Sequence, residues 1–201
     1  MKKMLRGLKV IVCLLVVAVV FGLLVLASFF FDIQLGPPLY EHHAGKYLNE
    51  HGFNPDIVSA VLDGKSLAHD SFLSLSQVPN VSVRHMLGRK ANLSLTERQV
   101  LLHDKNEFVR QGVALNPSLS SVEIAQMMSD SSPIVWGALA MNPAVSSDVL
   151  LELYHRRHVS LNEFAKNPKC PEAIVKEIEG SNNAQAKQIL GIVRAQQAAS
   201  K

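Results

Sequence analysis

The feature that most constrains this chain is an uncharged apolar segment near its N-terminus. From Val10 to Phe31 the sequence has 22 residues, and none of them is charged. As an α-helix, with a rise of about 1.5 Å per residue, this segment reaches roughly 33 Å, and the hydrocarbon core of a bilayer is about 30 Å thick. A helix is required because lipid offers no partner to an unpaired backbone group. The sequence therefore predicts one transmembrane helix over residues 10–31, in contact with the lipid bilayer.

The charges on either side of this segment predict its orientation. Residues 1–9 contain four cations and no acidic residue, and the first acidic residue of the chain is Asp32. By the positive-inside rule, residues 1–9 form a cytoplasmic basic flank and the body is exported. The Lys-rich start is typical of a bacterial protein, so we expect a single-pass protein of the inner (cytoplasmic) membrane with a periplasmic body.

A cleavable signal peptide is the alternative to this signal-anchor. The residues before Ser28 end in Ala27, which suits a cleavage site, and a cut there would release a secreted soluble binding domain. However, the apolar run is longer than a usual signal-peptide core of about 7–15 residues, and it continues past that site to Phe31. A retained anchor is therefore the preferred interpretation.

The charge and cysteine content of the body exclude two classes of protein. Four of the 20 basic residues precede the apolar run, which leaves 16 basic against 17 acidic residues. Nucleic-acid binding needs clustered cations, so we expect no nucleic-acid partner. Cys13 lies in the apolar run and Cys170 stands alone in the body, so the body is not a disulfide-stapled module.

The segment that follows the apolar run predicts a linker. Gly36 is followed by Pro37 and Pro38, and consecutive prolines favour extended chain over helix. Residues 32–40 are therefore expected to be a short, stiff, non-helical spacer.

The body is expected to be all-α, because it has no run of alternating β-branched residues. Residues 41–82 form its helical N-terminal part, in which Asn54 and Pro55 begin a short amphipathic helix that Gly64 stops. Residues 181–201 are expected to form a C-terminal helix.

Internal repetition organises residues 83–180. Four asparagines recur at spacings of 24, 26 and 25 residues, and three of them precede a proline: Asn92, Asn116-Pro117, Asn142-Pro143 and Asn167-Pro168. The residue before a proline is disfavoured in a helix, and asparagine can bond the backbone of the resulting turn. Four positions later come residues suited to starting the next helix: Thr96, Ser120, Ser146 and Pro171. Each unit is therefore predicted to be a short helix, a turn and a second short helix.

The apolar columns of the repeats predict the core. Eight positions after each asparagine are residues expected to face inward: Val100, Ile124, Leu150 and Val175. Small residues before the asparagines would let neighbouring helices approach closely: Gly88, Gly112 and Ala138. One unit has too little apolar surface to fold alone, so stacking of helix-pair repeats into a short α-solenoid is expected.

The repeats, exemplified by the run from Val109 to Pro117 followed by Ser120 to Met128, resemble the leucine-rich repeat variant family, a relative of HEAT-like helical repeats. The resemblance covers about residues 83–180. It implies a curved stack of helices and, by analogy, the binding of other proteins. A known family member holds an iron–sulfur cluster through cysteines that precede its repeats. This sequence has no such cysteine cluster, so the resemblance implies no cofactor here.

Histidines are the only candidates for catalysis or metal binding. His155 and His158 lie one helical turn apart, but zinc needs three or four ligands and their neighbours in sequence are two arginines. His42, His43 and His51 lie nearer the apolar run. Without a glycine elbow, a phosphate loop or paired carboxylates, we expect no enzyme and no bound metal. The alternative is an envelope metal-binding protein or enzyme that uses these surface histidines.

Arg84, Arg110 and Trp136 are the candidate partner-binding residues. Each follows a valine near the start of a repeat's first helix, so they are expected to line one ridge, and tryptophan and arginine are enriched in binding hot spots. The alternative is that Trp136 packs inward and the arginines are solvated. The expected function is a membrane-anchored protein-interaction module, acting as adaptor, assembly factor or inhibitor in a bacterial envelope complex.

Overall fold

The computed structural model describes residues 37–199, and every regular element within them is an α-helix. The twelve helices of this part are α2 (Pro37–Glu50), α3 (Pro55–Leu62), α4 (His69–Ser76), α5 (Val81–Gly88), α6 (Leu95–Leu102), α7 (Glu107–Ala114), α8 (Ser121–Met128), α9 (Pro133–Met141), α10 (Ser147–His155), α11 (Leu161–Ala165), α12 (Glu172–Gly180) and α13 (Ala184–Ala199). The predicted all-α class is confirmed for these residues. The predicted transmembrane helix over residues 10–31 lies outside them, and none of the described helices is long and apolar enough to cross a membrane.

The predicted spacer over residues 32–40 is wrong at its C-terminal end, because α2 already begins at Pro37. A proline in the first turn of a helix removes an N–H that has no partner within the helix, and its fixed φ suits the helix start. Two consecutive prolines therefore began a helix here. The predictions for α3 and α13 hold: Asn54 caps α3 through the backbone N of Asp56, and Asn183 accepts from the backbone N of Ala186 in α13.

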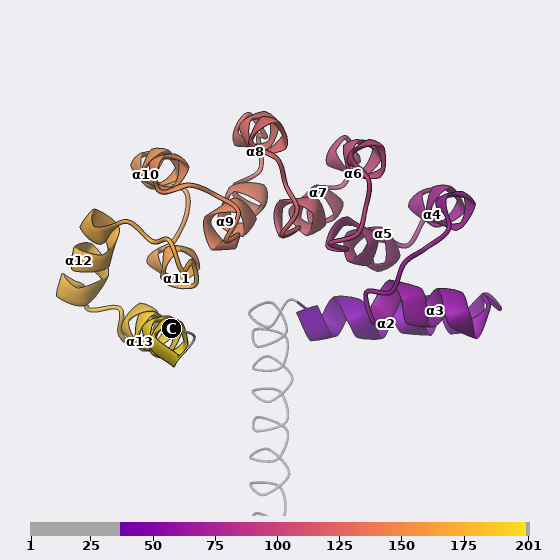
Figure 1. Cartoon of the computed structure of the whole chain (residues 1–201), viewed down its shortest axis with the longest axis horizontal. Helices are drawn as coiled ribbons and strands as arrows, with labels where there is room; N and C mark the ends of the chain where they lie inside the picture. Colours follow the sequence, from indigo (N-terminus) through magenta and orange to yellow (C-terminus); the bar gives the residue numbers. More distant parts are fainter. Residues whose placement is uncertain (1–36, 200–201) are drawn as a thin grey trace, which may run out of the picture. The chain divides into compact units, whose positions relative to one another are not determined.

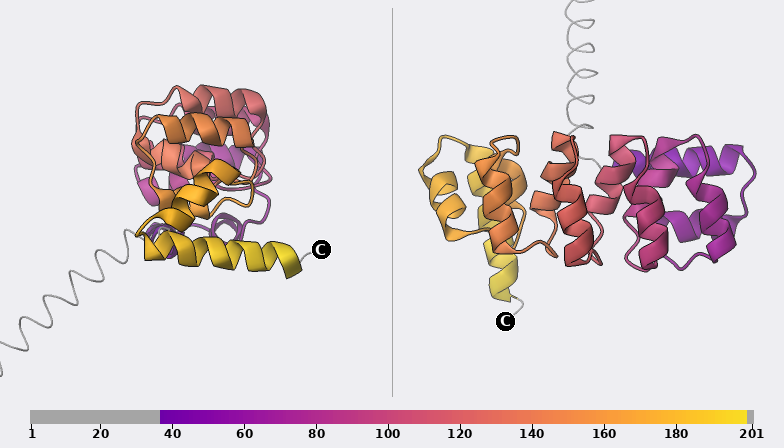
Figure 2. Two further views of the ribbon diagram at one scale, coloured as in Figure 1. Left: turned by 90° about the vertical axis from the view of Figure 1, so that its left-hand side faces the viewer. Right: turned by 90° about the horizontal axis from the view of Figure 1, so that it is seen from above.

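From His43 onward the described chain forms one compact unit, in which two layers of helices alternate along the sequence (Figure 1). We call α4, α6, α8 and α10 the outer layer, and α5, α7, α9 and α11 the inner layer. Successive helices of the inner layer pack directly on one another, and α11 also packs on α13. Seen from above, the helices of these two layers lie side by side (Figure 2). Each unit is thus an inner helix followed by an outer helix, as the repetition predicted.

Serine caps start three of the outer helices, α6, α8 and α10, whereas α4 follows Ala68 and has no side-chain cap. The hydroxyls of Ser94, Ser120 and Ser146 each accept a hydrogen bond from the backbone N three residues later. Ser94 and Ser120 belong to full capping boxes with Glu97 and Glu123, in which the carboxylate accepts a hydrogen bond from the cap residue's backbone N. Helix α6 is therefore capped at Ser94, two residues before Thr96, the residue at which the sequence pattern predicted the helix to start.

Three buried asparagines connect consecutive units. The Nδ2 atom of Asn142 donates to Ala114 O at 2.7 Å and to Asn116 O at 2.8 Å, and its Oδ1 accepts from the backbone N of Ala144. Asn116 and Asn167 make the corresponding three bonds in their own units. Each amide therefore closes its own Asn-Pro turn and also satisfies carbonyls at the end of the preceding inner helix. We call this series the asparagine ladder.

In the first unit the ladder position is Lys90 and not Asn92. Asn116 donates to Gly88 O and Lys90 O, which correspond to the two carbonyls that Asn142 and Asn167 reach. Lys90 itself is only 4% exposed, and its Nζ donates to Ala60 O and Lys65 O, both at 2.5 Å. Asn92 is exposed and donates to Ser66 Oγ. The ladder spacings are therefore 26, 26 and 25 residues.

The corrected register also corrects the core. Val100, predicted to face inward, is 40% exposed, and the position eight residues after Lys90 belongs to buried Arg98. Two columns of the ladder register are apolar and buried in every unit. They are Leu87, Val113, Leu139 and Phe164, three residues before the ladder, and Leu101, Met127, Leu153 and Ile178, eleven residues after it.

The asparagine ladder predicts that Asn142 contributes much more to the stability of the fold than Asn92. Replacing Asn142 with alanine removes the amide donor from the buried carbonyls Ala114 O and Asn116 O and the acceptor from the turn N–H of Ala144, so we expect a loss of about 2–3 kcal/mol and a Tm lower by about 5–10 °C. Asn92→Ala is the matched control and should cost less than about 0.5 kcal/mol, because that side chain is exposed. Thermal unfolding of the full-length chain followed by circular dichroism measures both. Equal effects would contradict the ladder register.

Candidate protein-binding surface

Arg84 and Arg110, two of the three predicted binding residues, are held in ion pairs inside the protein. Arg84 Nε lies 2.7 Å from Asp104 Oδ2, and Arg110 Nε lies 2.6 Å from Asp130 Oδ2. In each pair Nη2 contacts the second carboxylate oxygen, at 3.3 Å and 3.0 Å. Nη1 donates to a backbone carbonyl of the preceding unit, Val78 O and Asp104 O respectively. The guanidinium groups thus connect units and are not presented to a partner.

The charges of the second pair stabilise one another. The hydrogen bonds that Arg110 donates to Asp130, with the negative charges of the nearby carboxylates, raise the pKa of Arg110. Burial alone would raise the pKa of Asp130, but the hydrogen bonds from Arg110 and from the backbone outweigh it, so the pKa lies below its usual value. Both groups are therefore ionised at neutral pH.

In the third unit Trp136 stands at the position of Arg84 and Arg110. The position of their aspartate partners has also changed, to arginine. The aspartates lie 20 residues after Arg84 and Arg110, and the residue 20 positions after Trp136 is Arg156. Its Cζ lies 5.2 Å from the centroid of the Trp136 ring, a cation–π distance. A buried ion pair in two units is therefore replaced by a half-exposed aromatic–cation pair in the third.

Further aromatic and cationic side chains lie beside this pair. His158 packs against Trp136 with ring centroids 5.6 Å apart, and Arg157 lies over the Tyr154 ring at 4.8 Å. Arg157 has φ +59°, a left-handed conformation that costs a non-glycine residue about 1 kcal/mol or more. The Nε1 of Trp136 is buried, and the indole N–H makes no hydrogen bond to the described residues, unlike that of most buried tryptophans.

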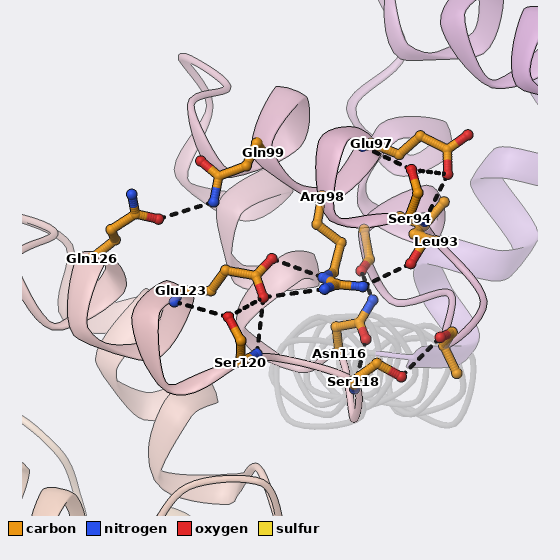
Figure 3. A network of polar contacts seen from close by, with 12 residues as sticks. Leu93, Ser94, Glu97, Arg98, Gln99, Asn116, Ser118, Ser120, Glu123 and Gln126 are labelled. Carbon is orange, nitrogen blue, oxygen red and sulfur yellow. Dashed lines mark hydrogen bonds and ion pairs between the residues drawn. The ribbon is translucent and has the colours of Figure 1, made fainter.

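The outer helices α6 and α8 are joined by a buried ion pair (Figure 3). Arg98 Nε lies 2.8 Å from Glu123 Oε1, Nη2 lies 3.2 Å from Oε2, and Nη1 donates to Leu93 O. Gln99 donates to Gln126 alongside. Burial alone would raise the pKa of Glu123, but the hydrogen bonds from Arg98 and Ser120 lower it below its usual value.

The next outer junction, between α8 and α10, carries shorter side chains and is open. In the ladder register Ile124 and Val149 replace the Arg98–Glu123 pair, and Ala125 replaces Gln99. The lost side-chain volume leaves a groove of about 390 Å³. Its apolar lining comes from Leu119, Ile124, Ala125, Met128 and Val149, and Arg156 and Glu152 lie among its polar lining residues. Arg156 therefore contributes both to the groove and to the Trp136 surface.

Four further histidines were candidates for metal binding or catalysis in the sequence: His42, His43, His51 and His155. His51 stacks on Tyr47 and hydrogen-bonds Tyr47 O, while His155 lies against Tyr154 with ring centroids 5.7 Å apart. His42 and His43 are exposed on α2. Within residues 37–199, no three His, Cys, Asp or Glu side chains converge in an arrangement that could hold a metal ion.

His85 provides a pH-dependent contribution to stability. It is 1% exposed between α5 and α7, and its Nδ1 donates to Phe108 O at 2.7 Å. Burial, with a smaller contribution from Arg89, lowers the pKa of His85 from 6.5 to about 4. Between these values the unfolded chain binds a proton that the folded chain does not, so stability falls as the pH falls.

We expect the free energy of unfolding to drop by about 2 kcal/mol from this histidine between pH 7 and pH 5, which lowers Tm by roughly 4–8 °C. His85→Asn retains a donor near the Nδ1 position but does not titrate, so its Tm should vary less over this range. Thermal melts of both proteins at pH 7, 6 and 5 make the comparison. Equal slopes for the two would contradict the assignment to His85.

The sequence pattern found Trp136 but missed its partner. The pairing of Arg84 with Asp104 and of Arg110 with Asp130 recurs at 20 residues, and this spacing was available as a signal. Comparison with protein-family models, curated proteins and solved structures gives no match for this chain. The chemistry of its own residues is therefore the basis for assigning a function.

Proposed function

We propose that this chain is a membrane-anchored helical-repeat protein whose body binds a protein partner, as adaptor, assembly factor or inhibitor in a bacterial envelope complex. Residues 10–31 would cross the inner membrane once, with residues 1–9 in the cytoplasm and the body in the periplasm. The alternation of inner and outer helices supports an α-solenoid, as does the resemblance to leucine-rich repeat variant proteins.

The observation that carries the binding proposal is the change of side chains in the third unit. There a pair that connects units in the first two repeats is replaced by Trp136 and Arg156, at an open groove. Tryptophan, tyrosine and arginine are the residues most enriched in binding hot spots. Of the predicted ridge, Trp136 alone is retained as a candidate contact, because Arg84 and Arg110 are bound by aspartates.

Photo-crosslinking in intact cells tests the binding proposal. A benzophenone amino acid at exposed His158 should give a discrete adduct of higher mass after irradiation, and the same label at exposed Lys176 in α12 should give much less. The lack of any adduct from His158, Lys176 and further exposed positions would count against a protein partner.

The anchor has its own test. The intact mass of the chain recovered from membranes should correspond to a polypeptide that retains residues 1–31, and alkaline carbonate should not release it. A mature chain that begins at Ser28 would instead establish the secreted soluble domain, and recovery of the full-length chain from the cytosol would refute both.

A further inference from the structure

We infer that the third unit is a carboxylate-binding site: Arg156 and the groove between α8 and α10 together take a segment of a partner protein in which an Asp or Glu lies next to a large apolar side chain. This inference rests on the proposed binding function and names the chemistry of the partner. The shared residue is Arg156, which lines the groove and covers Trp136.

The first two units show how this fold binds a carboxylate. Arg84 and Arg110 each use the Nε and Nη2 edge on both oxygens of an aspartate, with distances of 2.6 to 3.3 Å. Such paired, charge-assisted bonds are among the stronger ones that proteins make. In the third unit the aspartate position is itself arginine, so this unit has a guanidinium and no aspartate to bind it.

Arg156 is held in place but has only a weak anionic partner. Its Nη1 donates to Met128 O at 2.5 Å and its guanidinium lies over Trp136, which orients the group before any ligand arrives. Its Nη2 contacts Glu152 Oε1 at 2.7 Å, one turn earlier on the same helix, where the Glu152 side chain is 60% exposed. Exposed pairs at this spacing contribute little to stability, so an incoming carboxylate can displace Glu152.

The surrounding charge favours an anionic segment. Arg157 is exposed next to Arg156, so two guanidinium groups adjoin at the end of α10. The groove beside it is lined by apolar side chains from α8 and α10, with a volume that admits a leucine- or phenylalanine-sized side chain. A segment with an acidic side chain next to an apolar one would place its carboxylate on the Arg156 guanidinium and its apolar side chain in the groove at the same time.

The chain supplies its own matched variants. Trp136→Arg with Arg156→Asp rebuilds in the third unit the pair that Arg84 and Asp104 form in the first, so it should fold while losing the Arg156 guanidinium. Ile124→Arg with Val149→Glu rebuilds the Arg98–Glu123 pair at the open junction, so it should fill the groove. Circular dichroism melts confirm that each double variant is folded before binding is measured.

The probe is a phage-displayed library of random 12-residue peptides, selected on the full-length chain in non-ionic detergent at low salt. We expect enrichment of peptides with Asp or Glu adjacent to Leu, Ile, Phe or Met. By fluorescence anisotropy, the best peptide should bind at least about 10-fold more weakly to each double variant. Its own Glu→Gln or Asp→Asn version should lose about as much. Selected peptides that lack an acidic residue, or that bind both variants as well as the parent, would overturn the inference.

Two further outcomes separate this site from its alternatives. Concentration-dependent self-association that both double variants abolish would assign the groove to a second copy of the chain, and would overturn the inference. Crosslinks from His158 that persist unchanged in the Trp136→Arg, Arg156→Asp variant would remove this site and leave the proposed function standing. Peptide binding that behaves as expected, without any crosslinked protein in cells, would support the site chemistry and argue against the proposed function.

Discussion

Gly112→Ala is expected to disrupt the packing of α7 on α5. A Cβ atom at Gly112 would lie 2.4 Å from His85 O, 3.1 Å from His85 C and 3.2 Å from His85 Cα. These are backbone atoms, so no rotamer change relieves the clash and the two helices must separate. Separation opens the buried layer that contains Leu87 and Val113. We expect a cost of about 4 kcal/mol or more, and a Tm lower by at least about 10 °C.

Gly137→Ala is the matched control, because it lies in the next helix of the same layer. Its Cβ would meet Glu163 Cγ at 3.5 Å, an ordinary van der Waals distance. Since alanine is the better helix former by up to about 1 kcal/mol, this variant should match the parent or exceed it slightly in Tm. Melting curves of the two full-length variants decide the matter. Similar curves for both would show that the inner helices do not approach through Gly112.

The close approach at Gly112 is one of the features that could be predicted from the sequence. A small residue that recurs at one position of each repeat indicates a close neighbouring backbone, and breakers at regular spacing indicate short helices. The Asn-Pro turns were also predictable, since the residue before a proline leaves the helix and asparagine bonds the turn backbone. These are local rules, so they hold whichever units are neighbours.

The first unit was misregistered for a physical reason. Its ladder position has lysine, whose long side chain reaches Ala60 O and Lys65 O and so performs the task that the amide performs elsewhere. Burial lowers the pKa of Lys90. A pattern that looks for asparagine does not find lysine in this position. The alignment was therefore made on Asn92, an exposed asparagine two residues later.

Whether the predicted ridge of Arg84, Arg110 and Trp136 is available to a partner depends on residues that lie far away in the sequence. Whether an arginine is solvated or buried depends on a carboxylate within reach, and for Arg84 and Arg110 that carboxylate lies 20 residues later, in the loop that leads to the next unit. Trp136 was identified on residue type, but Arg156 and the groove became visible only when α8 and α10 were placed side by side. The anchor over residues 10–31 stays a prediction from composition.

Glu123→Ala is the second substitution expected to have a large effect. Glu123 is fully buried, and its loss leaves the Arg98 guanidinium, with 9% of its side chain exposed, without an anion. It also removes the capping box of α8, since a carboxylate oxygen accepts from Ser120 N at 2.8 Å. Removing one partner of a buried pair costs about 3–5 kcal/mol, so we expect Tm to fall by about 10 °C.

The double variant Arg98→Ile, Glu123→Val distinguishes an uncompensated charge from a loss of packing. It copies the apolar pair Ile124–Val149 that the next junction already uses. Because replacing both members of a buried ion pair by apolar residues is often nearly neutral, we expect it to recover most of the stability lost in Glu123→Ala, and to remain about 1–2 kcal/mol below the parent for the lost cap. The single Arg98→Ile variant completes the cycle, from which the coupling energy follows. If the double variant melts at or below Glu123→Ala, the ion pair contributes to stability directly. The junction between α8 and α10, which has Ile124 and Val149 in place of this ion pair, would then be less stable than the junction between α6 and α8. Lower stability at an open groove is typical of a binding site.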